Sequence, residues 1–556
     1  MHIDWSELRG EIIGRDATIL TPYGERVLLY ADFTASGRGL RSIERYVERI
    51  LELYANTHTE DDTTGRLTSQ RLAAAEALIR RRLNAGEHYK LISVGAGATA
   101  AVTRLQQILG IYLSPATRDR LGDRASLPPE RLPVVFVGPY EHHSNEISWR
   151  EGLCEVVEVE LDDHGFLSLE DLATKLGDPR YRGRQKIGSF SAASNVSGIR
   201  TDVYAVARVL HAHDALAFFD FSASAPYVAI DVEHDAESYF DGVFFSPHKY
   251  LGGPGASGIL VIRDAIYRRD LPPSVAGGGT VRFVNARTQD YVDDIEEREK
   301  AGTPAIIQTI RAALAIDLQH LIGVERIEER EQELTRRAFA RLGQVPGVEI
   351  IGDAPPQDRL AIFSFNIRTG HSYLHPRFVV RLLNDLFGIQ ARAGCSCAGP
   401  YGHRLLHIDL ETSERYRRYI TEGHAGIKPG WVRLNFHYLT SDAEFDFLCR
   451  AIAFVASHGT YFLADYRFDS HTGSWTHLRE AEEIGGLGAA EALAGGIVGG
   501  IAGQEPALTD EELDEARRRA LDEAMERAQE LVDAFSSAEL HETTDELIPF
   551  SYISET

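Results

Sequence analysis

Between residues 90 and 263 the sequence repeats a unit of one short apolar run, rich in β-forming residues, and one longer stretch with helical spacing. Strands that alternate with helices pack as a mostly parallel sheet with helices on both faces. The pattern therefore predicts an α/β domain built on a mostly parallel, seven-stranded sheet. The runs cover residues 90–94, 134–138, 155–161, 186–192, 216–221, 241–246 and 258–263.

The remaining sequence predicts a smaller second domain and a distinct C-terminal region. A helical pattern at about 305–342 leads into a stretch of mixed strand and helix patterns. Residues 484–503 are rich in Gly and Ala and predict a linker, and 508–536 predict a charged amphipathic helix begun by Thr509 or Asp510. The expected parts are an N-terminal segment at 1–30, a large α/β domain at 31–305, a linking helix with a small α+β domain at 306–470, and a tail at 471–556.

Composition and charge narrow the classes of partner. The net charge of −25 repels phosphate backbones and anionic lipids, so neither nucleic acid nor a membrane is expected as a partner. The sequence contains no apolar run of membrane-spanning length and no signal-peptide pattern, which predicts a cytoplasmic protein. Four cysteines in 556 residues are too few for a disulfide framework. A special cysteine is therefore expected to be reactive rather than structural.

Polar residues follow several of the predicted strands, where ligands of such sheets bind. The segment Gly95–Thr99 leads into a helix, so the backbone N–H groups around Ala98 and the hydroxyl of Thr99 suit a phosphate, although a plain strand–helix turn has the same composition. His142 follows the second run and either stacks on an aromatic ligand or fills a loop. Asn195 follows the fourth run and offers an amide to a ligand or stabilises a polar turn.

Two charged residues follow strongly apolar runs. Asp220 follows the apolar residues LAFF of the fifth run, where a buried carboxylate needs a cation or several donors; a helix cap is the alternative role. Lys249 lies in Ser246-Pro247-His248-Lys249, between two hydrophobic strands and before a glycine-rich turn. A lone lysine is usually a solvated surface charge, but this setting favours an amine that forms a Schiff base with a carbonyl cofactor.

The order of these parts resembles the class V aminotransferase family of fold type I pyridoxal-phosphate enzymes, and particularly its cysteine desulfurase and selenocysteine lyase branch. The resemblance covers roughly residues 25–455. Its motifs are YADFTASG at 30–37, GATAA at 97–101, EHHSNEISW at 141–149, SNVSG at 194–198, DFSASAP at 220–226, SPHKYLGGPGASGIL at 246–260, AGTPAI at 301–306, RAGCSCAGP at 392–400 and WVRLNFHYL at 431–439.

The resemblance implies pyridoxal 5′-phosphate as cofactor and a homodimer with its sites at the subunit interface. The implied roles are Lys249 as the Schiff-base lysine, Asp220 as partner of the pyridinium nitrogen, His142 as the stacking residue, Asn195 near the ring hydroxyl, Thr99, Ser246 and His248 with the Ala98 backbone at the phosphate, and Thr303 at the neighbouring subunit's phosphate. The family usually has Gln three residues after the aspartate, where this chain has Ala223.

The segment RAGCSCAGP resembles the one that carries the nucleophilic cysteine of desulfurases. The match implies that Cys397 takes sulfur from L-cysteine as a persulfide and releases alanine, that Arg392 and Arg433 bind the substrate carboxylate, and that an acceptor protein receives the sulfur. Cys395 has no partner pair at zinc-site spacing. The alternatives are an aminotransferase or C–S lyase in which Cys397 is a small packed residue, and a scaffold protein without cofactor.

Overall fold

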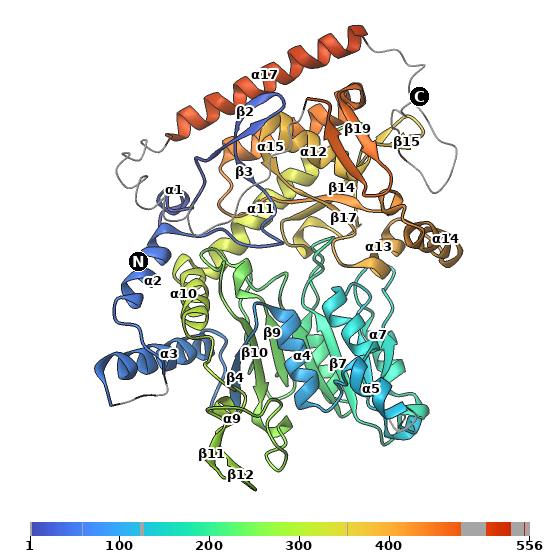
Figure 1. The fold of residues 1–556 in the computed structure, drawn as a ribbon. Helices are drawn as coiled ribbons and strands as arrows, with labels where there is room; N and C mark the ends of the chain where they lie inside the picture. The colour runs from blue at the N-terminus through green and yellow to red at the C-terminus, as the bar shows by residue number, and fades with distance from the viewer. Residues whose placement is uncertain are drawn as a thin grey trace.

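In the computed structural model the chain forms a large and a small domain. The large domain lies at the bottom of Figure 1 and the small domain at the top. The structure describes residues 3–57, 59, 61–122, 127–352, 354–479, 508–534 and 550. The predicted linker at 484–503 lies outside these residues. Among the residues described, no helix combines the length and the apolar character needed to cross a membrane.

A seven-stranded sheet in the order β4-β10-β9-β8-β7-β5-β6 forms the centre of the large domain. Strands β6, β5, β7, β8 and β9 pair in parallel, and β10 pairs antiparallel with β9 and β4. The predicted mostly parallel, seven-stranded sheet is therefore confirmed. The strands are β4 (Tyr89–Val94), β5 (Val134–Val137), β6 (Glu155–Glu158), β7 (Lys186–Ser191), β8 (Ala215–Asp220), β9 (Gly242–Phe245) and β10 (Gly258–Arg263).

Helices cover both faces of this sheet because consecutive strand residues point to opposite sides. Phe218 packs in a cluster with α4 (Ala98–Ile108). Its neighbour Phe219 packs in a separate cluster with α8 (Val203–His211) and α7 (Leu169–Leu176). Continuous apolar runs such as LAFF are thus buried on both faces, which is why they read as uninterrupted apolar segments.

Two consecutive helices connect the large domain with the small one. The pattern at 305–342 predicts continuous helix, whereas the structure has α10 (Ile306–Ile322) and α11 (Val324–Leu342). The chain breaks at Gly323, whose φ of 97° lies in a region that side chains other than glycine rarely adopt. Helix α10 packs against α3 (Thr63–Arg82) of the large domain, and α11 packs against α15 (Asp442–His458) of the small one.

The small domain contains an antiparallel sheet in the order β13-β14-β18-β17, with β15 paired to β14. One face of this sheet packs with α15 and α12 (Pro376–Phe387) in a second hydrophobic core. The N-terminal segment joins this domain through β3 (Leu29–Tyr30), which pairs in parallel with β16 (Ile389–Gln390). The sheet strands are β13 (Val348–Ile350), β14 (Ile362–Thr369), β15 (Ser372–Tyr373), β17 (Arg392–Gly394) and β18 (Trp431–Asn435).

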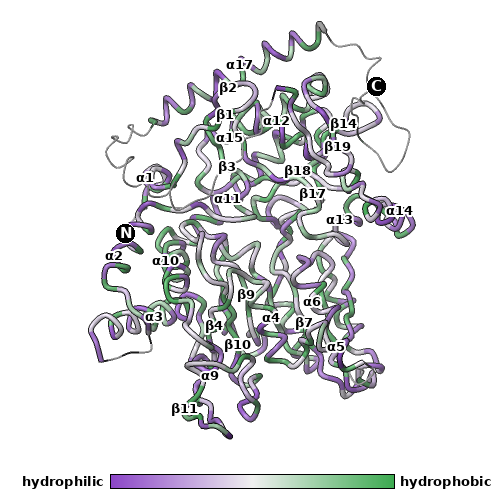
Figure 2. Tube along the Cα trace, viewed as in Figure 1, coloured by the Kyte–Doolittle hydropathy of each residue, from purple (hydrophilic) through white to green (hydrophobic). Residues whose placement is uncertain are grey.

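The charged C-terminal helix packs on the small domain rather than extending from it (Figure 1). Helix α17 (Asp510–Ala534) begins after Thr509, whose hydroxyl accepts the N–H of Glu512. Apolar and polar residues alternate along it (Figure 2), and its apolar residues, Leu521 among them, join the core of the small domain. Buried Arg517 pairs with Glu444 at 3.1 Å. The predicted amphipathic helix is therefore an integral layer of this domain.

Candidate active site

The residues expected at the strand ends meet in one cavity of about 700 Å³. It lies between the carboxyl ends of the parallel strands and the β17–β18 edge of the small domain, as expected for a ligand site in such a sheet. The predicted residues that line it are Ala98, Thr99, His142, Asn195, Asp220, Ser246, His248, Lys249, Arg392, Cys397 and Arg433.

One end of the cavity is built by the N-terminus of α4. The helix begins after Gly97 without a side-chain cap, and Ser246 Oγ accepts the Ala98 N–H at 2.9 Å. A Cβ at Gly97 would lie 2.9 Å from that Oγ, so the backbone here approaches as closely as only glycine allows. The Thr99 hydroxyl lies 2.7 Å from that of Ser144. Hydroxyls and helix N–H groups together suit a phosphate.

The cavity floor carries a buried amine and a buried carboxylate. Burial lowers the pKa of Lys249 to about 8, an effect that nearby Asp220 opposes. Burial also raises the pKa of Asp220, whose carboxylate accepts the Ser222 N–H at 2.8 Å. A lysine with this pKa is largely neutral in mildly basic solution and can attack a carbonyl carbon. A cation beside Asp220 would hold the carboxylate in its charged form.

Aromatic and polar groups line the space above this pair. Burial, with Lys249 second, lowers the pKa of His142 to about 4, so the ring is neutral, and its Nδ1 accepts the Ser144 N–H. One buried atom on the cavity lining, Asn195 Oδ1, has no hydrogen-bond partner in the described part of the chain. Buried polar groups without partners are rare in proteins, and this oxygen is available to a polar ligand.

Cys397 faces the same cavity from a strained loop of the small domain. The loop leaves β17 and enters α13 (Gly399–Leu405), and both Ser396 and Cys397 have positive φ, 49° and 58°. Non-glycine residues in this region cost roughly 1–3 kcal/mol each and occur where the surrounding structure imposes them. The Asn195 amide donates to the Ser396 carbonyl at 2.7 Å and anchors the loop to the large domain.

His143 holds the cysteine loop by two hydrogen bonds. Its backbone N–H donates to the Cys397 carbonyl at 2.8 Å, and its Nε2 accepts the Gly399 N–H at 2.9 Å. An acceptor role requires that Nε2 carry no proton. Burial, with Lys428 second, lowers the pKa of His143 and so favours this neutral form. The sequence did not identify this role; the adjacent histidine pair in EHHSN was its only signal.

The other cysteines are less suited to react. Burial raises the pKa of Cys154 and of Cys449 to about 12, which keeps these thiols protonated. Cys395 packs against the core of the large domain, whereas Cys397 is exposed. The thiolate is the nucleophilic form, so the accessible thiol at 397 is best placed for chemistry.

Two arginines lie beside the loop. Arg392 and Arg433 are opposite each other on β17 and β18. Arg433 is buried and donates to the Asn195 carbonyl at 3.1 Å, and both arginines bind Asp32, a residue that the sequence reasoning did not single out. Thr303 lies outside the lining of the cavity and accepts a hydrogen bond from Asn56.

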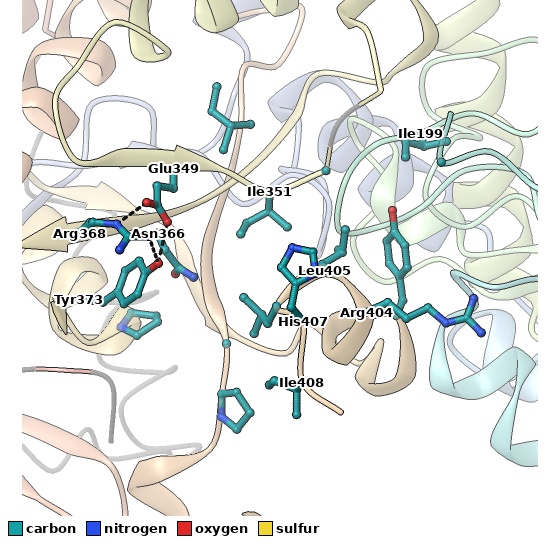
Figure 3. Close-up of a pocket in the computed structure, with 18 of the residues that line it drawn as sticks. Ile199, Glu349, Ile351, Asn366, Arg368, Tyr373, Arg404, Leu405, His407 and Ile408 are labelled. Atoms are coloured by element: carbon teal, nitrogen blue, oxygen red, sulfur yellow. Dashed lines mark hydrogen bonds and ion pairs between the residues drawn. The ribbon is translucent and has the colours of Figure 1, made fainter. Parts of the chain in front are cut away.

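A larger cavity, of about 1070 Å³, lies between the small domain and the loop at 161–166, and none of the predicted site residues lines it. Figure 3 shows part of its lining. Polar groups on its wall already bind one another: Arg368 pairs with Glu349 at 2.5 Å, and the Tyr373 hydroxyl donates to Glu349 at 2.8 Å. His407 points into a mainly apolar part of it (Figure 3). We assign no chemistry to this cavity.

A family model for "Aminotransferase class-V" matches residues 30–444 of this chain. The chain belongs to the class-V aminotransferase family. Curated relatives include a "Probable cysteine desulfurase" of Halalkalibacterium halodurans, 29% identical over 67% of this chain and 84% of the relative. A protein of the same description from Staphylococcus aureus strain Mu50 is 28% identical over the same shares.

Solved structures with the same fold include two cysteine desulfurases. The apo enzyme of Thermococcus onnurineus NA1 has a TM-score of 0.65 and 23% identity, covering 82% of this chain and 99% of that one. An Escherichia coli enzyme with an S-sulfonic acid has a TM-score of 0.62 and 21% identity, covering 81% and 98%. These likenesses confirm the expected fold type I architecture with a smaller second domain.

The cofactor of this family is pyridoxal phosphate, and the cavity fits it. A close backbone approach and two hydroxyls at the α4 N-terminus match the phosphate. Buried Lys249, whose lowered pKa favours the neutral amine, is suited to bind the aldehyde. Buried Asp220, whose carboxylate needs a cation beside it to stay charged, is suited to bind the protonated ring nitrogen. The unpartnered Asn195 Oδ1 matches a polar ring substituent. Ala223, at the family's usual Gln position, lines the cavity without adding a donor.

Proposed function

We propose that this protein is a pyridoxal-phosphate-dependent cysteine desulfurase that takes sulfur from L-cysteine, leaving alanine and a persulfide on Cys397. The observation that carries the proposal is that an accessible cysteine and a buried, neutral-prone lysine line one cavity together with two arginines. The curated relatives described as probable cysteine desulfurases support the same reaction.

The cofactor would be held at three places. Ala98, Thr99, Ser246 and His248 would bind its phosphate, His142 and Asn195 its ring, and Lys249 with Asp220 its aldehyde and ring nitrogen. When bound, pyridoxal phosphate supplies an aldehyde that joins to an amine and a ring that accepts electrons from the bound substrate.

The protein side chains orient the substrate and carry the protons. Arg433, with Arg392, binds the α-carboxylate, because a guanidinium engages a carboxylate through parallel hydrogen bonds. Lys249 Nζ in its neutral form accepts the proton of the substrate Cα. The Cys397 thiolate then attacks the substrate sulfur: an S–S bond forms as the C–S bond breaks. The electron pair of that bond stays with the substrate, which is protonated on carbon to give alanine.

A homodimer, a sulfur-acceptor protein and a cytoplasmic location complete the proposal. Thr303, outside the lining of this chain's cavity, suits a role toward the phosphate of a neighbouring subunit. The exposure of Cys397 suits transfer of the sulfur to a partner. The net charge of −25 suits neither nucleic acid nor an anionic membrane as that partner.

Product analysis tests the reaction directly. Holoenzyme is mixed with L-cysteine and a thiol reductant, and sulfide and alanine are quantified for the wild type, Cys397→Ala and the matched control Cys395→Ala. We expect Cys397→Ala to lose on the order of a hundredfold or more in both products, because the nucleophile is gone. Cys395→Ala should stay within about threefold of the wild type. Equal rates for Cys397→Ala and the wild type, or amine transfer to a keto acid without sulfide, would contradict the proposal.

A further inference from the structure

A buried carboxylate without a part in the proposed reaction lies directly before His142. This residue, Glu141, is 3% exposed and belongs to the loop that follows β5. Its Oε1 accepts the N–H of Gly138 at 3.1 Å and that of Ser191 at 2.8 Å. Its Oε2 accepts the Ser191 hydroxyl at 2.6 Å and the Asn145 amide at 2.7 Å. Because Ser191 is the last residue of β7, this one carboxylate ties the loop to the end of β7.

Asn145 fastens the same loop to β7 on the other side of His142. Its amide donates to the Ser189 carbonyl at 3.1 Å, and its Oδ1 accepts the Ser189 hydroxyl at 2.6 Å. The indole N–H of Trp149 donates to the same Oδ1 at 3.0 Å. Asn145, Ser189 and Trp149 are fully buried, and a buried network whose members are hydrogen-bonded is rigid. His142 is thus held between two residues that are both fixed to β7.

The ring of His142 takes its position from this loop. Within the described residues its only hydrogen bond is the one that Nδ1 accepts from the Ser144 N–H at 3.1 Å, inside the same turn. His142 and Ser191 both line the cavity, so the anchored residue and its anchor border one space. Gly138 leaves the room for the anchor, because a Cβ there would lie 2.5 Å from Glu141 Oε1. The backbone fixes the ring, and Glu141 with Asn145 fixes the backbone.

We propose that Glu141 is a positioning residue that holds His142 in place for the cofactor ring. This role rests on the proposed function, which assigns His142 to that ring. Contact between two rings depends on their separation and offset, so a histidine on a loosened loop would contribute less to binding. Burial raises the pKa of Glu141 to about 7, an effect that its hydrogen bonds with Ser191 and Asn145 oppose. Glutamine is therefore a close replacement for its neutral form.

Cofactor binding and the circular dichroism of the bound cofactor test this role. The Kd of pyridoxal phosphate is measured by titration of the apoenzyme of the wild type, Glu141→Ala and Glu141→Gln, and visible dichroism and Tm are recorded with saturating cofactor. Glu141→Ala should raise the Kd about tenfold or more and weaken the visible dichroism, because four buried donors lose their acceptor and the loop loses its anchor. Glu141→Gln keeps one oxygen for the Gly138 and Ser191 N–H groups and should recover part of both.

Asp241 supplies a matched control, a buried carboxylate at the other edge of the same sheet. It is 3% exposed, lies directly before β9 outside the lining of the cavity, and accepts the Ala217 N–H at 2.8 Å. Asp241→Asn should lower the Tm but keep the Kd within about threefold of the wild type. If Glu141→Ala likewise lowers only the Tm, its role is purely structural and the inference is overturned.

The remaining outcomes also decide. If Glu141→Ala does not fold, Glu141→Gln must raise the Kd at least about threefold, and a wild-type Kd with wild-type dichroism overturns the inference. Failure of the proposed function is distinguishable: a wild type that binds pyridoxal phosphate but releases no sulfide contradicts the reaction and leaves the role of Glu141 intact. A wild type that binds no pyridoxal phosphate overturns both.

Discussion

The two halves of the candidate active site are built in different ways. The cofactor half lies at the ends of buried parallel strands, where Asp220 ends β8 and Lys249 follows β9. The cysteine half is a loop with two left-handed residues that depends on contacts from the large domain. The cofactor residues take their positions from the sheet, whereas Cys397 takes its position from His143 and Asn195. Binding and sulfur chemistry should therefore respond separately to mutation.

The largest effect is expected when the lysine amine of the cofactor half is removed. Lys249→Ala should lower the rate of sulfide release on the order of a thousandfold or more, because both the proton acceptor and the anchor of the cofactor are lost. The cofactor absorption band of the purified protein should disappear as well. Sulfide release is measured together with the absorption spectrum. A Lys249→Ala variant that keeps both the wild-type rate of sulfide release and the absorption band would contradict the role of Lys249 in the cofactor half.

A smaller effect is expected when the loop loses its support. His143→Ala removes the ring acceptor of the partly buried Gly399 N–H and should slow sulfide release about ten- to a hundredfold, because this donor is left unpaired and the loop loses a contact that holds it. The Kd for pyridoxal phosphate should stay within about threefold of the wild type.

The exposed His234 supplies a matched control for this variant. His234→Ala should match the wild type in both measurements, and His143→Gln should recover part of the rate because its amide oxygen can accept the same N–H. Loss of cofactor binding in His143→Ala would show that the two halves are not separable.

The smallest expected effect is a pH dependence of cofactor uptake, which involves only the cofactor half. With the Lys249 pKa lowered to about 8, the reactive neutral amine increases as pH rises toward that value. The rate at which the apoenzyme takes up pyridoxal phosphate should therefore rise about fivefold from pH 7 to pH 8 and level off above pH 9. Stopped-flow absorption measures this rate. A profile still rising steeply above pH 9 would indicate a lysine of ordinary pKa.

The sequence predicted the cofactor half of the site better than the cysteine half, for a physical reason. Strands of a parallel sheet all end at one edge, so the residues after each apolar run, Thr99, Asp220 and Lys249 among them, could be grouped without coordinates. The contacts of His143 with Cys397 and of Asp32 with Arg433 join segments hundreds of residues apart, and no periodicity encodes them. The break at Gly323 was readable in principle from the glycine itself.

The packing of α17 also required the structure. Its sequence shows an apolar stripe among charges, which predicts a helix but does not identify its partner. The stripe packs on the small domain, and buried Arg517 is neutralised by Glu444 on α15. A charged helix at the end of a sequence can thus belong to the core of a preceding domain.

Mapping the sulfur after one turnover tests the central claim most directly. Holoenzyme is given one equivalent of L-cysteine, its thiols are blocked, and the peptide that contains residues 392–400 is fragmented in a mass spectrometer. The account predicts one added sulfur atom on Cys397, with alanine formed in equal amount. Alanine formed while the added sulfur lies on Cys395, on another cysteine or on none would contradict it.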